Sequence, residues 1–204
     1  MNKITFKAIL DFIVLSLLIF IYKNQNDASL TFKNSATILA FGDSITYGYR
    51  VSADSSYPSQ LEKKTGLHVI NAGVSGEETS EGLLRLPELL KQKPDLVILC
   101  HGGNDILRKR SHVKLKNNLM AMINLIKASG AKVLLVGVPD LNLFGFKALA
   151  LYSEVAEESE VMLEDDILSF VESDRSLKID RIHPNKKGYE LMAEAFMKHI
   201  TLSQ

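Results

Sequence analysis

Two short stretches of this sequence carry side chains that could form a nucleophilic catalytic site. Ser44 follows the apolar run Ile38–Phe41 in a Gly-Asp-Ser turn, and Asp180 and His183 stand together near the other end of the chain. A serine hydroxyl becomes a nucleophile when a base takes its proton, and a histidine base needs an acid on its second ring nitrogen. One turn could bring the Asp180 carboxylate to the His183 imidazole. These residues predict a Ser-His-Asp site, provided that the fold brings Ser44 to His183.

Attack on a carbonyl also requires hydrogen-bond donors for the oxyanion that develops. A glycine backbone N–H and an asparagine side chain suit this role, and Gly76 and Asn104 can supply them, with the Ser44 N–H as a third donor. Gly76 lies in the polar stretch NAGVSGEETS, and Asn104 lies in HGGND. We therefore expect Ser44, Gly76 and Asn104 to form the oxyanion hole.

Elements around these loops predict an α/β fold with a parallel sheet. Short apolar runs alternate with stretches of helical periodicity, which is typical of βαβ units with helices on both faces of the sheet. The loops after the first three strands then emerge at one edge, where such sheets bind ligands. Expected strands are 37–41, 67–71, 95–100, 132–138 and a short 161–163, and expected helices include 57–64, a leucine-striped helix around 83–90, 113–128, 146–158, 167–171 and 186–202.

Composition excludes several classes of protein. The chain has 204 residues, which suits one main domain, and 24 Lys+Arg balance 24 Asp+Glu, so no basic excess argues for nucleic-acid binding. Cys100 is the single cysteine, which excludes an intrachain disulfide and CxxC-type metal sites. It ends an apolar run, so we expect a buried thiol. We assign 28–35 as a polar linker and 36–204 as the catalytic domain.

The first 27 residues have the pattern of an export signal or a membrane anchor. Lys3 and Lys7 precede an apolar run from Phe12 to Tyr22, and polar residues follow it. The run is shorter than the roughly 20 residues that span a bilayer, and no clean small-x-small cleavage site follows. We expect a periplasmic or secreted protein, or one that the N-terminal segment anchors to the membrane; a core helix of the domain is the alternative.

Four motifs in this order resemble the SGNH (GDSL-type) hydrolases, and the similarity covers nearly the whole chain beyond residue 36. EGLLRLPELL, together with the block before it, is similar to the bacterial acyl-CoA thioesterase I, lysophospholipase and arylesterase branch. The resemblance implies a three-layer α/β/α sandwich with a flavodoxin-like sheet of about five strands. The matching blocks are FGDSIT around Ser44, NAGVSGEETS around Gly76, GGND around Asn104 and DRIHP around His183.

The resemblance also implies roles for individual residues. Ser44 would be the nucleophile, His183 the general base and acid, and Asp180 its orienting partner, with Ser44, Gly76 and Asn104 as the oxyanion hole. The implied reaction is hydrolysis of small-molecule acyl esters or thioesters through an acyl-enzyme, without a cofactor or metal. A carbohydrate or cell-wall O-acetyl esterase is the alternative within enzymes. A non-catalytic lipid-binding envelope protein is the alternative outside them.

Two departures from the family pattern leave the substrate open. His101 precedes Gly102-Gly103 where an acidic or apolar residue is expected, and it could touch substrate. The basic loop Arg108–Arg110 is either simply solvated or a contact for an anionic head group or CoA phosphate. An acyl groove is expected between the Gly76 loop and the loop after Asn104. Four residues after the fourth strand could line it or belong to the core: Leu141, Leu143, Phe144 and Phe146.

Overall fold

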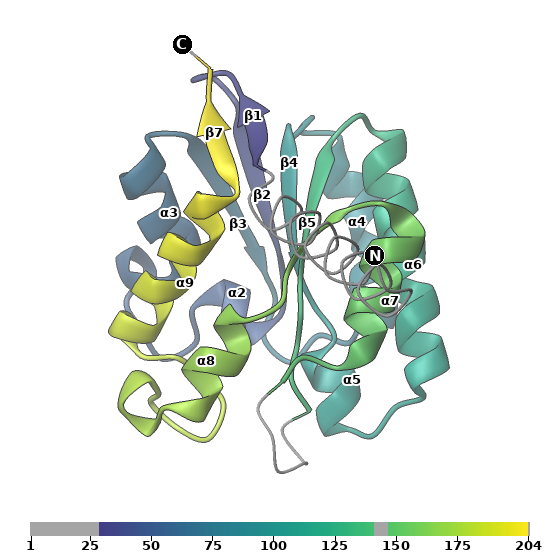
Figure 1. Cartoon of the computed structure of the whole chain (residues 1–204), viewed down its shortest axis with the longest axis vertical. Helices are drawn as coiled ribbons and strands as arrows, with labels where there is room; N and C mark the ends of the chain where they lie inside the picture. The colour runs from purple at the N-terminus through teal and green to yellow at the C-terminus, as the bar shows by residue number, and fades with distance from the viewer. Residues whose placement is uncertain (1–28, 141–146, 204) are drawn as a thin grey trace, which may run out of the picture. The chain divides into compact units, whose positions relative to one another are not determined.

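The computed structural model describes residues 29–140 and 147–203 of the chain (Figure 1). The predicted export segment and the apolar residues between 141 and 146 lie outside the described residues. The chain divides into two units, Met1–Leu30 and Thr31–Gln204, and the central sheet, its helices and the site described below lie in the second. Within the described ranges, no helix combines the length and the hydropathy that a membrane crossing requires.

Five parallel strands form the central sheet in the order β3-β2-β4-β5-β6. Counted from β2, this is the flavodoxin-like order 2-1-3-4-5, as the sequence predicts. Gly42 at the end of β2 pairs with Gly73 of β3 and with Cys100 of β4, so these three strands end level. The strands are β2 (Thr37–Gly42), β3 (His68–Gly73), β4 (Leu96–Cys100), β5 (Lys132–Val136) and β6 (Met162–Glu164).

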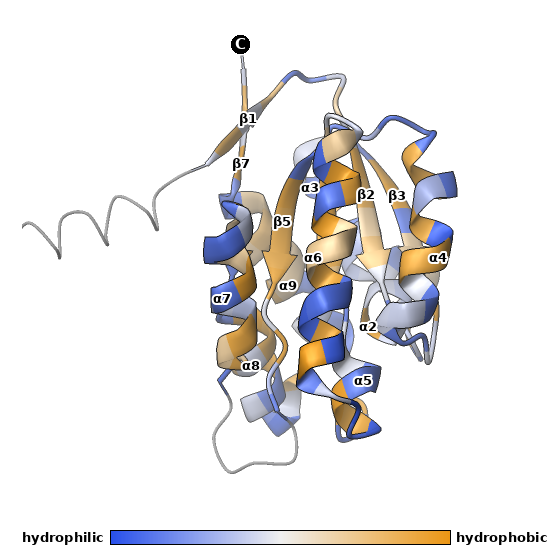
Figure 2. Cartoon of the chain, turned by 90° about the vertical axis from the view of Figure 1, so that its right-hand side faces the viewer, coloured by the Kyte–Doolittle hydropathy of each residue, from blue (hydrophilic) through white to orange (hydrophobic). Residues whose placement is uncertain are grey.

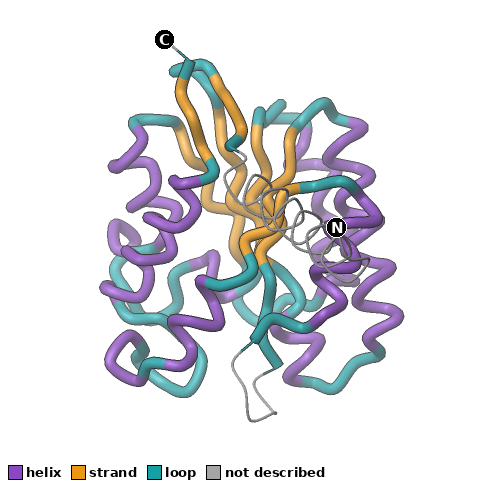
Figure 3. The backbone as a smooth tube through the Cα atoms, in the orientation of Figure 1, coloured by secondary structure: helices purple, strands orange, loops and turns teal. Residues whose placement is uncertain are grey.

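Helices cover both faces of this sheet and complete the predicted three layers (Figure 1). The tube in Figure 3 shows the strands enclosed between two groups of helices. One group is α3 (Tyr57–Thr65), α8 (Ile167–Ser173) and α9 (Lys186–Lys198); the other is α4 (Thr79–Leu90), α6 (His112–Ala128) and α7 (Ala150–Ser159). The short helices α2 (Ser44–Tyr47) and α5 (Gly103–Leu107) lie at the carboxyl edge of the sheet, and 3-10 turns span Ala53–Ser55 and Arg175–Leu177.

Hydrophobic patterning explains why these segments take these places. Every residue of β4 is buried, because helices on both faces leave no strand face in water. The apolar stripe of α6, from Leu115 to Ile126, is buried, and its outward side is mixed, with polar residues beside the exposed Val113 and Leu125 (Figure 2). Gly66 ends α3 in the left-handed conformation, with φ 73°, as its position after the last helical residue predicts. Cys100 is buried, also as predicted.

Three sequence predictions about local structure are wrong. Leu84 is 83% exposed, because it lies two residues from the buried Leu86 and so about 200° around α4 from it. The C-terminal helix ends at Lys198, and Ile200–Leu202 forms strand β7. This strand pairs with β1 (Leu30–Phe32), which lies inside the predicted linker, and Ser203 N donates to Phe32 O at 2.8 Å.

Candidate active site

The turn after β2 places the Ser44 hydroxyl at the carboxyl edge of the sheet. Gly42 must lack a side chain, because a Cβ there would lie 2.0 Å from the Cys100 carbonyl oxygen on the neighbouring strand. Asp43 then caps α2, since its Oδ1 accepts a hydrogen bond from the Ile45 N–H at 3.0 Å. Ser44 is therefore the first residue of α2, and the close packing of Gly42 and the Asp43 cap fix its position.

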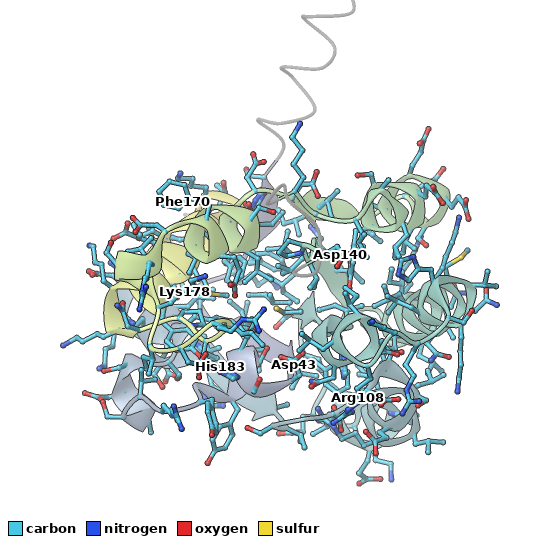
Figure 4. All side chains as sticks on the ribbon, turned by 90° about the horizontal axis from the view of Figure 1, so that it is seen from below. Asp43, Arg108, Asp140, Phe170, Lys178 and His183 are labelled. Carbon is cyan, nitrogen blue, oxygen red and sulfur yellow. The ribbon has the colours of Figure 1, made fainter. Side chains whose placement is uncertain are left out.

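Ser44, His183 and Asp180 lie in one hydrogen-bonded chain. The Ser44 Oγ is 3.0 Å from His183 Nε2, although the two residues are 139 positions apart. His183 Nδ1 lies 2.9 Å from Asp180 Oδ2 and 3.0 Å from Oδ1. The contact on which the sequence interpretation depends is therefore present. Figure 4 looks onto this edge of the sheet, with His183 on the C-terminal part of the chain and Asp43 near the middle.

Backbone donors hold the Asp180 carboxylate in its ionised form. Its Oδ1 accepts the N–H groups of Ile182 and His183, each at 2.9 Å. Partial burial alone would raise the pKa of Asp180. These bonds and the His183 ring outweigh it and lower the pKa to about 2. Asp180 is thus a permanent anion near neutral pH, and it favours the His183 tautomer that carries its proton on Nδ1.

Residues of the loop after α2 also contact the acid and the base, which sequence reasoning missed. The Tyr49 ring packs against the His183 ring with centroids 4.5 Å apart. The Arg50 guanidinium lies 3.8 Å from Asp180 Oδ2. Residues 46–56 form a mostly polar stretch with two tyrosines, but no local pattern could indicate which side chains would reach a histidine more than 130 positions away.

Asn104 and Ser44 line the same pocket, whereas Gly76 lies on an adjoining loop. Asn104 Nδ2 donates to the Glu77 carbonyl at 3.0 Å and, over a longer 3.3 Å, to Asp43 Oδ2. Gly76 has a left-handed φ of 83°, and among the described residues it is not part of the pocket wall. The structure brings two of the three predicted donors together, and the oxyanion hole stays a prediction.

A buried ion-pair network supports the loop that carries Asn104. His101, whose role the sequence leaves open, is completely buried, with Nε2 3.0 Å from Glu77 Oε2 and Nδ1 accepting the Gly102 N–H, and it is not part of the pocket wall. Arg85 donates to both Glu77 oxygens at 2.6 Å and to the Ala72 carbonyl at 2.8 Å. Burial alone would raise the pKa of Glu77, but these two partners outweigh it and lower the pKa.

Removing the Glu77 carboxylate is expected to destabilise the fold by about 3 kcal/mol, because Glu77→Ala leaves the Arg85 cation and the buried His101 without their partner. Urea denaturation measures this loss. Glu88→Ala is the matched control, since Glu88 pairs with Lys91 on the exposed surface of the same region and its loss should cost under about 1 kcal/mol. Equal stability of the two variants would contradict the importance of the network.

Two further acidic residues, Asp43 and Asp105, fix loops at this edge. Asp105 accepts hydrogen bonds from the Thr79 N–H at 2.8 Å and from its hydroxyl at 2.7 Å, which ties α5 to the start of α4. Asp43 is buried, and burial raises its pKa. Both side chains therefore stabilise the loops that surround Ser44 and Asn104.

Two arginines of the basic loop after α5 form ion pairs with Glu78. Arg108 donates to Glu78 Oε1 at 2.8 Å and to the Gly76 carbonyl at 3.0 Å, and Arg110 also pairs with Glu78. These bonds attach the Gly76 loop to the end of α5. Contact of this loop with an anionic group of a substrate stays a prediction.

A pocket of about 80 Å³ opens beside Ser44 and His183. It lies between α5, the segment after β5 and α8, whereas the predicted groove lay between the Gly76 loop and the loop after Asn104. Leu107 lines the pocket but Gly76 does not, and the Arg108 and Glu78 side chains join the two segments of the predicted groove. Glu172 is a wall residue that sequence reasoning missed, although it follows the buried Leu168 by four positions and so shares its helix face. The apolar wall consists of Ile45, Leu107, Val138, Pro139, Leu168 and Ile182.

Comparison with known proteins agrees with this architecture. The arylesterase of Vibrio mimicus is 34% identical over 181 residues, which cover 81% of this chain and 90% of that protein. Thioesterase 1/protease 1/lysophospholipase L1 of Escherichia coli K12 is 33% identical over 181 residues, covering 84% of this chain and 87% of that one. The psychrotrophic esterase EstA of Pseudoalteromonas sp., in a structure inhibited by monoethylphosphonate, superposes with a TM-score of 0.72 at 25% identity, covering 81% and 96% of the two chains. Residues 40–191 match the sequence model of the GDSL-like lipase/acylhydrolase family, and the chain belongs to that family.

Proposed function

We propose that this protein is a serine esterase that hydrolyses acyl esters or thioesters through an acyl-enzyme. The observation that carries the proposal is the 3.0 Å contact between Ser44 Oγ and His183 Nε2, with Asp180 on the other ring nitrogen. The arylesterase and thioesterase activities named for its relatives support the same reaction.

In the first half of the proposed reaction, Ser44 Oγ attacks the acyl carbonyl while His183 Nε2 takes the hydroxyl proton. The carbonyl oxygen becomes an oxyanion, which the N–H groups of Ser44 and Gly76 and the Asn104 side chain stabilise. Asn104 can turn its amide toward the oxyanion by giving up the longer of its two bonds, the one to Asp43. The tetrahedral intermediate then expels the alcohol or thiol, which takes the proton from His183.

In the second half, water attacks the acyl-serine ester and gives its proton to His183 Nε2. Collapse of the second tetrahedral intermediate breaks the bond to Ser44 Oγ, which recovers a proton from His183. The products are a carboxylic acid and the regenerated enzyme. Asp180 stabilises the imidazolium in both halves, and its pKa of about 2 keeps it ionised throughout.

The size of the pocket bears on which acyl groups enter it. Its volume of about 80 Å³ is near half that of a cavity of about 150 Å³ that accommodates benzene, which favours short acyl chains. This observation also supports the second candidate, an esterase that removes acetyl groups from carbohydrate or cell-wall polymers. The two candidates share the reaction and differ in the alcohol.

A serine-directed ethyl phosphonate should label the protein once, at Ser44, because the His183 base activates this hydroxyl. Intact mass followed by peptide mapping measures the label. A series of p-nitrophenyl esters and acyl-CoA thioesters, assayed in parallel, then separates the candidates: a sharp optimum at acetate favours the deacetylase. Pure protein that is both inactive on the series and unlabelled would instead support a non-catalytic lipid-binding protein.

We also propose that residues 1–27 direct export or anchor the protein to a membrane. Support comes from Lys3 and Lys7 ahead of the apolar run from Phe12 to Tyr22. Cell fractionation tests this proposal, and recovery of the full-length protein from the cytosol would contradict it.

A further inference from the structure

Glu172 places a carboxylate in the otherwise mostly apolar wall of the pocket beside Ser44. The residue lies on α8, is 2% exposed, and follows Leu168, another wall residue, by one helical turn. Its Oε1 is buried and has no hydrogen-bond partner among the described residues. A buried polar atom without a partner is costly, so a carboxylate at this place needs an explanation.

The other side of the carboxylate has a structural partner. Glu172 Oε2 lies 3.3 Å from Lys178 Nζ, and this ammonium also donates to the carbonyl oxygens of Glu172 and Arg181. Lys178 is therefore tied to the loop that carries Asp180 and His183 through backbone acceptors as well. Burial raises the pKa of Glu172 to about 7; Lys178 opposes this shift, and Asp180 adds to it. The loop thus has anchors besides the carboxylate, and Oε1 has no hydrogen-bond partner of its own among the described residues.

The neighbours of Oε1 indicate the kind of group that would pair with it. A ligand cation would meet the positive charge of Lys178 close by, which disfavours an ammonium group. A hydroxyl has no net charge; it can donate to an ionised carboxylate and accept from a protonated one. The surrounding wall, with Leu168, Val138 and Ile182, suits the hydrocarbon part of an acyl chain.

We propose that Glu172 is a specificity-determining residue that binds a hydroxyl group on the acyl chain of the substrate through Oε1. The inference rests on the proposed function and narrows its substrate class to short hydroxyacyl esters or thioesters. A purely structural Glu172 would instead affect all acyl groups equally, through the position of the loop that Lys178 holds.

Matched pairs of substrates separate these two roles. The first measurement is kcat/KM for p-nitrophenyl butyrate and for its 2-hydroxy and 3-hydroxy derivatives, with the wild type, Glu172→Met and Glu172→Gln. Dividing each hydroxy ester by butyrate, and then variant by wild type, cancels the intrinsic reactivity of the esters. Methionine keeps the length of the side chain without a carboxylate. Glutamine keeps a polar group: Lys178 can only donate, so the amide oxygen faces Lys178 and the NH₂ takes the place of Oε1.

The methionine variant should lower this ratio at least about 10-fold for one of the two hydroxy esters, the effect expected when a bond to a charged acceptor is lost. The glutamine variant should stay within about threefold of wild type, because its NH₂ can donate to the same substrate hydroxyl and retains part of the interaction. A ratio that changes less than about twofold in the methionine variant, whatever the common rate, would overturn the proposal.

A binding measurement keeps the inference testable if the methionine variant does not fold or if no ester is hydrolysed. Wild-type protein is titrated with 2-hydroxybutyramide, 3-hydroxybutyramide and butyramide, neutral analogues that carry the same acyl groups, and followed by NMR. One of the two hydroxyamides should bind at least about 10-fold more tightly than butyramide, and equal affinities of all three would overturn the role of Glu172. If no ester is hydrolysed but a hydroxyamide binds selectively, the proposed esterase function would be refuted and the hydroxyl-binding role of Glu172 would stand.

Discussion

Replacing Ser44 with alanine is expected to lower kcat/KM for short acyl esters by about 10⁴-fold to 10⁶-fold, the range seen when a catalytic serine is removed. No other hydroxyl is placed by a described contact against His183 Nε2, so the variant loses the acyl-enzyme route and not merely part of its rate. Binding should survive, because the methyl group leaves the pocket wall in place. Steady-state kinetics with p-nitrophenyl butyrate and phosphonate labelling measure the two effects.

Ser173→Ala is the matched control for this variant. Ser173 is an exposed serine at the end of α8 whose hydroxyl donates to the Phe170 carbonyl, and its loss should leave kcat/KM within about twofold of wild type. A Ser44→Ala protein that keeps more than about a tenth of the activity would exclude Ser44 as the nucleophile, since no residual route of that size is expected without it.

Short-range patterns account for the parts of this structure that sequence analysis predicted. The apolar runs ending at Gly42 and Cys100 identify buried parallel strands, and the flavodoxin-like order places the loops that follow them at one edge. The Asp180–His183 contact is also local, because it spans three residues within one turn. The contact between Ser44 and His183 is not local, because it joins residues 139 positions apart. It depends on how α8 and α9, which flank the loop that carries His183, pack against the sheet.

The features that sequence analysis missed depend on contacts between distant segments. Nothing next to His101 in the sequence indicates its environment, because its partner Glu77 lies on another loop. In the fold the two side chains are buried together and pair with each other. Sequence analysis assigns strand β7 to the end of a helix. Its partner β1 lies some 170 residues away, and pairing between such distant strands has no local signature. Glu172 illustrates the same limit: helix periodicity places it on the buried face, but not beside a catalytic serine.

Changing Asp180 to asparagine is expected to lower kcat/KM by about 10³-fold to 10⁴-fold while leaving the fold intact. An asparagine Oδ1 can keep the bonds from the N–H groups of Ile182 and His183, which turns the amide NH₂ toward His183 Nδ1. That nitrogen must then accept a hydrogen bond, so the ring proton moves to Nε2. A protonated Nε2 donates to Ser44 Oγ and cannot take its proton.

Asp174→Asn separates this tautomer effect from the general loss of a capping carboxylate. Asp174 Oδ1 accepts the Ser176 N–H at 2.8 Å in much the same way, but on the exposed 3-10 turn, so its variant should stay within about twofold of wild type. Because the pKa of Asp180 is about 2, its own titration does not limit the activity of the wild type near neutral pH. A loss below about 10-fold would mean that the serine and histidine act without a fixed tautomer, and the roles assigned to this cluster would then need revision.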